Sequence, residues 1–322
     1  MYKSINMKYL FLIITFSSLC CGQNFKEVDS IVKLYPKDFN TIKDLASKIK
    51  TDFSSNENRS RATFFWISNS IYYDVEFSEK LEQNTINAFS FSSDNDFQRK
   101  LKEFNLGLAI KTFNSKKAVC HGYSALFNEV MNKLGIESKL IVGNLKCNPS
   151  QIGAKLETNH AWNIVKIDDQ YKFIDCTLAA GTISSKTNKF SLDYNDSYFF
   201  TDPELFYLNH YPKEEEWLLV KNKTKSDYQK LPLFFAAYLN YSPNLILPLI
   251  GKLSSEEEFK ILLNQFDYER DYLQFFFSNE KSRTKIEISP NQENVSISLL
   301  NKKNQVLYLF INSKPLAAYL VE

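Results

Sequence analysis

Three residues of the kinds that cooperate in nucleophilic catalysis occur along the chain in the order Cys120, His160 and Asp175. A cysteine nucleophile needs a base that takes its proton, and the base needs a group that orients its ring. The sequence contains three histidines, His121, His160 and His210. His121 directly follows Cys120, and adjacent residues of a helix do not face each other. His160 is therefore the strongest candidate for the base.

The candidate nucleophile stands at the start of the most regular helical pattern in the sequence. Residues 120–134 place apolar side chains at intervals of three and four, and Gly135 follows as a C-cap. A helix N-terminus carries partial positive charge and free backbone N–H groups, which favour a thiolate and can bind an oxyanion. The alternative interpretation is that Cys120 is a small packed residue without a chemical role.

The candidate base and its orienting acid are expected on neighbouring strands of one hairpin. Segments 160–167 and 171–176 have the composition of strands, and a short acidic turn separates them. With a two-residue turn, His160 opposes Thr177, and Asp175 lies diagonally across from His160 on the same face. Diagonal neighbours are about 7–8 Å apart, within reach of an imidazole and a carboxylate. This spacing does not establish that the pair faces the cysteine.

The segments around these residues resemble the transglutaminase-like superfamily, which has the papain-type fold. The resemblance is carried by the nucleophile segment 118–127, the histidine segment 159–166 and the aspartate segment 173–177. Segments 61–67 and 198–217 resemble the kyphoscoliosis-peptidase-like branch of that superfamily. Together these segments extend the resemblance over most of the central part of the chain.

The resemblance implies a catalytic triad of Cys120, His160 and Asp175. It implies an α+β fold with a papain/transglutaminase-like core, in which N-terminal helices pack on an antiparallel sheet. The implied activity is that of a cysteine peptidase or amidase, or of a transglutaminase-type acyltransferase, on a peptide or protein substrate. The alternative is a non-catalytic protein that binds a peptide, glycan or protein partner at the cleft and the C-terminal module. No cofactor and no metal are expected.

The order of patterned segments predicts the domain organisation. Helices are expected at 40–53 and 58–70, and the polar, weakly patterned stretch 76–100 is expected to be a long loop or an irregular flap. Alternating apolar residues after position 284 predict a small β-rich, sandwich-like module. The expected boundaries are a signal peptide at 1–22, an N-terminal helical segment at 23–57, a transglutaminase-like domain at 58–220 and the β-rich C-terminal module at 231–322.

The N-terminal residues have the pattern of a secretory signal peptide. Two lysines precede the apolar run 9–16, and small residues lead to a cleavage zone that ends at Gly22. The run is too short to span a membrane. Export to a periplasm, to the cell surface or to the medium is therefore expected. A lipid anchor on Cys20 or Cys21 fits less well, because Leu19, directly before Cys20, stands where a lipoprotein signal has a small residue.

Composition and charge narrow the function classes. The chain has 322 residues, of which 44% are hydrophobic and 24% charged, and this indicates a globular protein of about two domains. The formal net charge of +2 provides no basic field, so a nucleic-acid partner is not expected. No segment after the signal peptide reaches the roughly 18 consecutive apolar residues of a membrane span, so none is expected in the mature chain.

Three cysteines follow the expected cleavage site, at positions 120, 147 and 176. An odd number in an exported protein leaves at least one thiol without a partner within the chain. Cys147 and Cys176 are a candidate disulfide, which would leave Cys120 as the free thiol. A buried free cysteine is the ordinary alternative. The sequence contains no CxxC pair, which argues against a structural zinc site.

Overall fold

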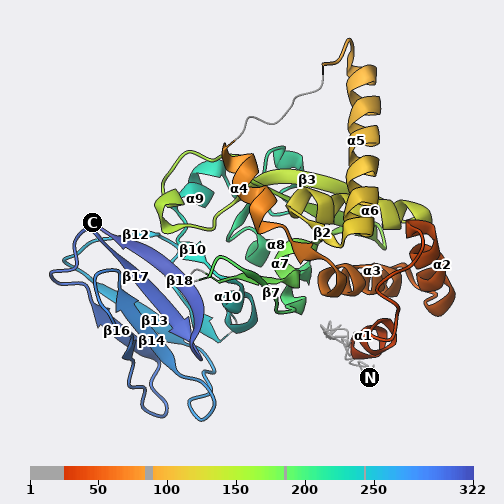
Figure 1. The fold of residues 1–322 in the computed structure, drawn as a ribbon. Coiled ribbons are helices and arrows are strands. Elements are labelled where there is room, and N and C mark those ends of the chain that lie inside the picture. Colours follow the sequence, from red (N-terminus) through yellow and green to blue (C-terminus); the bar gives the residue numbers. More distant parts are fainter. Residues whose placement is uncertain (1–24, 84–89, 185–186, 243) are drawn as a thin grey trace, which may run out of the picture.

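The structure is a computed structural model that describes residues 25–83, 90–184, 187–242 and 244–322 (Figure 1). The predicted signal peptide lies outside the described residues. Among the residues described, no helix is long and apolar enough to cross a membrane. The chain forms a mixed helix-and-sheet part, which contains the three candidate residues, and a β-rich C-terminal part (Figure 1).

A five-stranded antiparallel sheet organises the first part. Its strands are β3 (Ser138–Leu145), β4 (His160–Ile167), β5 (Gln170–Ile174), β8 (Phe199–Thr201) and β9 (His210–Pro212). The spatial order is β8-β5-β4-β3-β9, so β4 is the central strand. The two outer strands come late in the chain and pair with β5 and β3. The sheet is therefore complete only when residues as far as 212 are present.

Four helices beside this sheet supply most of the core. They are α1 (Lys26–Val32), α2 (Ile42–Asp52), α3 (Asn56–Ser70) and α6 (Cys120–Leu134). Helices α6 and α3 contact β4, whereas α1 packs on α3 and α2 packs on α6. The side chains of Thr41 and Ser55 cap the N-termini of α2 and α3. Gly135 ends α6 with a φ of 72°, the left-handed conformation that favours glycine. The three helices expected from periodicity are thereby confirmed.

The stretch expected to be a long loop at 76–100 is largely helical, so that prediction was wrong. It contains α4 (Val75–Gln83) and the first part of the 22-residue α5 (Asp94–Ser115), which projects from the body of the protein (Figure 1). Ser93 caps α5, and Arg99 forms ion pairs with acidic side chains one turn away on each side. A polar helix of this kind is stabilised by ion pairs between side chains one turn apart rather than by an apolar stripe. The periodicity of its apolar residues is therefore weak.

The C-terminal part consists of two sheets that share one core, as expected for a sandwich-like module. One sheet contains β10 (Leu233–Phe234), β12 (Lys252–Leu253), β14 (Leu273–Phe277), β15 (Thr284–Lys285), β17 (Gln305–Ile311) and β18 (Lys314–Val321). The other contains β11 (Leu245–Ile246), β13 (Glu258–Leu263) and β16 (Asn294–Ser298). Strict alternation of exposed and buried residues along β13 and β16 identifies the face that each strand turns to the core.

A buried lysine joins the two parts of the chain. Lys146 directly follows β3 and is only 1% exposed. Its Nζ donates to the carbonyl oxygens of Tyr228 at 2.9 Å and Leu231 at 2.6 Å. These acceptors lie where α9 (Lys225–Lys230) leads into β10 of the C-terminal part. The lysine therefore connects the central sheet to the segment from which the second module begins.

Short elements complete the framework. A two-stranded parallel sheet precedes the nucleophile helix, and a small helix follows the central hairpin. The remaining elements are β1 (Tyr72–Tyr73), β2 (Lys117–Ala118), α7 (Cys176–Ala180), β6 (Gly181–Ile183), β7 (Phe190–Leu192), α8 (Pro203–Phe206), α10 (Ala236–Tyr241) and three 3-10 turns at Pro149–Gln151, Asp196–Tyr198 and Glu215–Trp217.

Candidate functional site

Cys120 is the first residue of α6, and the chain just before it is firmly held. The backbone N–H of Asp74 donates to the carbonyl of Ala118 at 2.9 Å, which ties β2 to β1. Two residues after the cysteine, Gly122 lies so close to α5 that a Cβ there would meet Thr112 Oγ1 at 2.5 Å. Strand pairing on one side and close helix packing on the other thus fix the half-buried thiol at a helix N-terminus.

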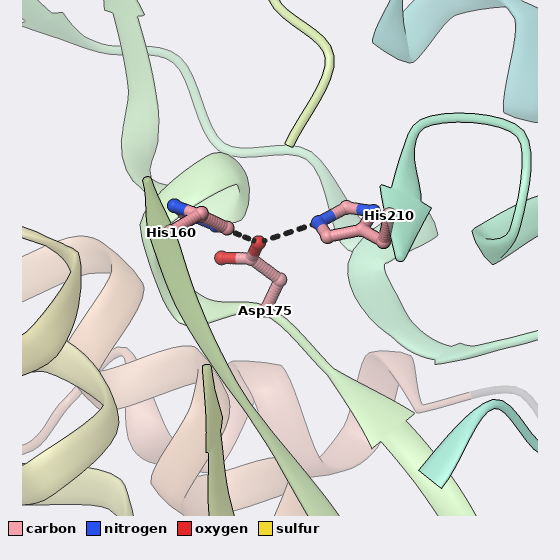
Figure 2. A group of neighbouring side chains, drawn as sticks. All are labelled: His160, Asp175 and His210. Atoms are coloured by element: carbon pink, nitrogen blue, oxygen red, sulfur yellow. Dashed lines mark hydrogen bonds and ion pairs between the residues drawn. The ribbon is translucent and has the colours of Figure 1, made fainter. Parts of the chain in front are cut away.

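His160 and Asp175 form a buried pair at the end of the central hairpin (Figure 2). His160 begins β4, and its Nε2 lies 2.7 Å from Asp175 Oδ2. The register of β4 and β5 agrees with the two-residue turn expected from the sequence. The expected pairing of His160 with Thr177 was wrong, however, because β5 ends at Ile174.

Asp175 meets the histidine from a helix cap instead of from the strand. It is the N-cap residue of α7, and its Oδ1 accepts the backbone N–H groups of Thr177 at 2.8 Å and Leu178 at 2.9 Å. An aspartate at an N-cap commonly accepts such bonds. They hold the carboxylate so that its second oxygen, Oδ2, is directed at His160 (Figure 2).

A second histidine contacts the same carboxylate oxygen. His210, the first residue of β9, places its Nε2 3.2 Å from Asp175 Oδ2 (Figure 2). In the sequence, His210 stands out only as one of the three histidines. His210 comes close to Asp175 because β9 pairs with the edge of β3 that faces away from β4. This pairing joins residues more than 60 positions apart in the sequence. The nearest signal in the sequence is the resemblance of segment 198–217, which includes this histidine.

The electrostatics of the buried pair favour an imidazolium beside a carboxylate. Burial lowers the pKa of His160, but the charge and hydrogen bond of Asp175 and the hydrogen bond with Cys120 outweigh it and raise that pKa to about 10. Burial likewise raises the pKa of Asp175, and the two histidines outweigh this effect, so its pKa lies well below the usual range. Each charge is therefore stabilised by the other in a largely buried site.

The same hydrogen bond brings Cys120 into contact with His160. The imidazole that contacts the thiol is thus the one whose Nε2 is bonded to Asp175. The structure thus brings together all three residues that the sequence analysis selected. A thiol beside an imidazole that is itself bonded to a carboxylate is the set of groups that base-assisted attack by sulfur uses.

The remaining candidates lie outside this arrangement. His121 places its Nε2 2.8 Å from Asn105 Oδ1 of α5. Cys176 is buried, which raises the pKa of its thiol well above the ordinary value. Cys147 is exposed, and neither thiol is in a disulfide, so the candidate bridge between them was wrong. The chain leaves β5 before Cys176 and buries that side chain under α3, where Ser68 donates to its carbonyl oxygen.

His160, Asp175 and His210 also place three possible metal-ligating atoms within 4.8 Å of one another, the one such group among the residues that the structure describes. Those atoms are already engaged in the hydrogen bonds of the buried pair. A metal ion would have to replace the bonds that orient His160. The donor set therefore fits the orientation of an imidazole better than the coordination of a cation.

Residues 43–177 match the family model of the transglutaminase-like superfamily. The kyphoscoliosis peptidases of Mus musculus and Homo sapiens are each 28% identical over 182 residues, which cover 56% of this chain and 24% of those proteins. Hillarin of Drosophila melanogaster is 23% identical over 232 residues, which cover 67% of this chain and 26% of that protein. The chain therefore spans about a quarter of the length of these relatives. A crystal structure of a TGase, 21% identical, superposes with a TM-score of 0.31 over 58% of this chain and 40% of that one.

Proposed function

The chain carries a transglutaminase-like domain of the kyphoscoliosis-peptidase-like branch, and from this premise we propose that it is a cysteine enzyme that acts on amide bonds of peptides or proteins. Cys120 is the nucleophile, His160 transfers protons, and Asp175 orients His160. The observation that carries the proposal is the position of the His160 ring, which is hydrogen-bonded to Asp175 and to Cys120 at the same time.

The reaction begins with attack of the Cys120 sulfur on the carbonyl carbon of an amide. The oxygen of the tetrahedral intermediate is stabilised by backbone N–H groups at the start of α6, which a helix N-terminus leaves without helical partners. His160 then gives its proton to the leaving nitrogen, the C–N bond breaks, and a thioester on Cys120 remains. Asp175 keeps the ring in the required tautomer and stabilises its charged form.

The second half of the reaction removes the acyl group. His160 takes a proton from a water molecule, whose oxygen attacks the thioester carbon, and the sulfur leaves as a thiolate. The products are a carboxylic acid and the free enzyme. A primary amine in place of water would give a new amide, which is transamidation. We favour hydrolysis because water is the simpler acceptor, and a peptidase or amidase is thus the primary proposal.

The experiment compares the wild-type chain with Cys120→Ala and with the matched control Cys147→Ala. Each is incubated with a peptide library and a biotinylated primary amine, and mass spectrometry detects cleaved peptides and amine adducts. Removing the nucleophile is expected to lower turnover by about 10³-fold or more. Cys147→Ala is expected to retain wild-type turnover, because its side chain is exposed and belongs to neither half of the reaction.

Two outcomes would contradict the proposal. Wild-type turnover by Cys120→Ala would assign any activity to another group. A wild-type chain that neither cleaves nor joins amides, with Cys120 no more reactive than Cys147, would favour the non-catalytic protein that binds a peptide, glycan or partner. The ratio of hydrolysis to amine incorporation distinguishes peptidase from acyltransferase.

We also propose that the chain is exported, on the basis of the signal-peptide pattern in residues 1–22. Cleavage after Gly22 would leave α1, which begins at Lys26, and every later described element intact. The test is N-terminal sequencing of the chain from the cell envelope and medium of an expressing host. A mature chain that begins at Gln23 is the expected result, and retention of residues 1–22 would contradict it.

A further inference from the structure

We propose that His210 is a positioning residue of this site, which holds the Asp175 carboxylate in the orientation that the His160 ring requires. The inference rests on the proposed function, because it assigns a role within the same reaction. His210 does not touch the nucleophile in this assignment. It acts through Asp175, from a strand that lies far from the other members of the site in sequence (Figure 2).

The hydrogen bonds of the carboxylate carry the proposal. Oδ1 of Asp175 is held by two backbone N–H groups of α7, whereas Oδ2 is contacted by two imidazoles. Without His210, His160 would be the one partner of Oδ2 among these four hydrogen-bonding groups. His160 is also the ring that Oδ2 is required to orient. A donor that is independent of the reaction separates the two tasks, because His210 keeps its bond while His160 exchanges protons.

The protonation state of His210 suits this role. Burial lowers its pKa, and the charge of His160 adds to that effect despite the bond to Asp175. A carboxylate can only accept, so the proton lies on Nε2. Asn209 Oδ1 lies 2.7 Å from Nδ1, so the ring also has a hydrogen-bond partner on the side away from Asp175. Tyr198 is the other titratable side chain that faces the ring, with centroids 6.4 Å apart.

Aromatic rings hold the His210 side chain rigidly. Its ring stacks on Phe206 with centroids 3.8 Å apart and planes inclined by 12°. Trp162 packs edge-to-face against it at 5.1 Å and also stacks with His160 at 6.2 Å. His210 is 1% exposed, so water does not compete for its proton. A buried and stacked imidazole with a partner at each ring nitrogen is rigidly held, which is the property that a positioning group needs.

The test measures alkylation by iodoacetamide at neutral pH and requires no substrate. The labelling rate of Cys120 is divided by that of the exposed Cys147 in the same sample, and mass spectrometry quantifies each peptide. Labelling of the buried Cys176 reports unfolding and excludes a chain that has lost its structure. The ratio therefore follows the local activation of Cys120 independently of global stability.

Three substitutions separate hydrogen-bond donation from packing. His210→Phe keeps a ring in the aromatic stack but removes the donor, and His210→Asn is too short to reach Asp175. Both are expected to lower the Cys120 to Cys147 labelling ratio by about 10-fold to 100-fold, as expected when a reacting group is displaced by about 1 Å. His210→Gln carries an N–H donor at nearly the same distance and is expected to remain within about threefold of the wild type.

Phe206→Leu is the packing control. It removes the ring that stacks on His210 but leaves the hydrogen bond to Asp175, so the melting temperature should fall while the labelling ratio stays within about threefold. With a substrate from the library screen, His210→Phe should lower kcat and leave KM unchanged, because the residue is buried and contacts Asp175. Equal labelling ratios in His210→Phe and His210→Gln, whether both high or both low, would overturn the proposal.

Failure of this inference and failure of the proposed function give different results. If Cys120 of the wild type labels no faster than Cys147, the proposed cysteine enzyme is contradicted irrespective of His210. If Cys120 labels rapidly in the wild type and equally rapidly in His210→Phe, the enzyme assignment stands and the positioning role is wrong. Should His210→Phe expose Cys176 to labelling, the matched pair His210→Asn and His210→Gln decides the question.

Discussion

Asp175 performs two tasks with one side chain. Its Oδ1 caps α7 and its Oδ2 orients His160, so the carboxylate contributes both to folding and to the chemistry of the site. Asparagine and aspartate cap helices about equally well. Replacement by asparagine therefore removes the charge and retains the cap, whereas replacement by alanine removes both.

We expect Asp175→Asn to fold with nearly wild-type stability and to lose turnover by about 10²-fold to 10⁴-fold. The amide NH₂ of asparagine would face the N–H of His160, which favours the wrong tautomer of the ring. Asp175→Ala should in addition lose about 1–2 kcal/mol of stability through the missing cap. Urea unfolding and peptide turnover of the two variants separate these effects; equal stabilities would show that the cap contributes little.

The pH dependence of turnover tests the same interaction by another route. The charge of Asp175 contributes to raising the pKa of His160 to about 10, so the imidazolium persists in alkaline solution and is lost as the pH rises through that value. Removing the charge in Asp175→Asn lowers this pKa. The alkaline limb of kcat/KM should therefore move to lower pH in Asp175→Asn. His121→Gln, which changes a histidine bonded to α5, should leave the limb in place.

At the scale of elements, the site depends on close packing of β9 against β3. Gly143 of β3 lies opposite His160 on one side and Pro212 on the other. A Cβ at this position would lie 2.2 Å from the carbonyl oxygen of Tyr211 and 2.5 Å from the Trp162 ring. The absence of a side chain therefore permits the approach of the strand that carries His210.

Gly143→Ala is expected to destabilise the protein by about 1–3 kcal/mol through overpacking. Because the displaced atoms belong to β9 and to Trp162, it should also lower the alkylation rate of Cys120. The matched control is Gly107→Ala in α5, where a new Cβ meets nothing within 4 Å. That change should stabilise the helix by roughly 0.5–1 kcal/mol. Thermal unfolding compares the two, and a neutral Gly143→Ala would contradict the packing argument.

Local patterns in the sequence were sufficient to predict the elements that carry Cys120 and His160. Three such patterns are the apolar stripe of α6, its glycine C-cap and the two-residue turn between β4 and β5. Each depends only on residues that are close together in the sequence. The proximity of Cys120 to the hairpin was implied by family resemblance and not by spacing. The helical character of α5 was missed because ion pairs on an exposed helix leave no apolar stripe.

The contribution of His210 could not be predicted from periodicity, because it arises from sheet order. β9 joins the sheet beside β3 and not beside β8, its predecessor in the chain. No local pattern encodes which edge a late strand selects. The end of β5 at Ile174 was also missed, since an aspartate followed by small residues fits both a strand end and a helix cap.

At the scale of the whole molecule, Lys146 couples the two parts of the chain. Its ammonium donates to two backbone carbonyls of the connecting segment and lies 4.8 Å from the centroid of the Tyr228 ring. Burial lowers the pKa of this lysine from 10.5 to about 7. Between these values the unfolded chain holds a proton that the folded chain has released, so this group makes the protein more stable as the pH rises.

Lys146→Met should remove that dependence. The free energy of unfolding of the wild type minus that of Lys146→Met is expected to increase from about pH 7 to about pH 9.5. The opposite contribution of His160 is present in both chains and cancels in the difference. Lys133→Met, at an exposed position of α6, serves as the control. Urea titrations at the two pH values provide the measurement, and a constant difference for Lys146→Met would contradict the buried-charge account.

The outer strands of the five-stranded sheet come late in the chain, and this has a practical consequence for the choice of recombinant fragments. The family match ends at residue 177, whereas β8 and β9 lie beyond it and cover β5 and β3. A fragment cut at that boundary would expose two rows of unpaired backbone groups, through which strands of separate molecules associate. Such a fragment is expected to aggregate. The smallest usable unit is therefore determined by hydrogen bonding at the rim of the sheet and not by the position at which sequence similarity fades.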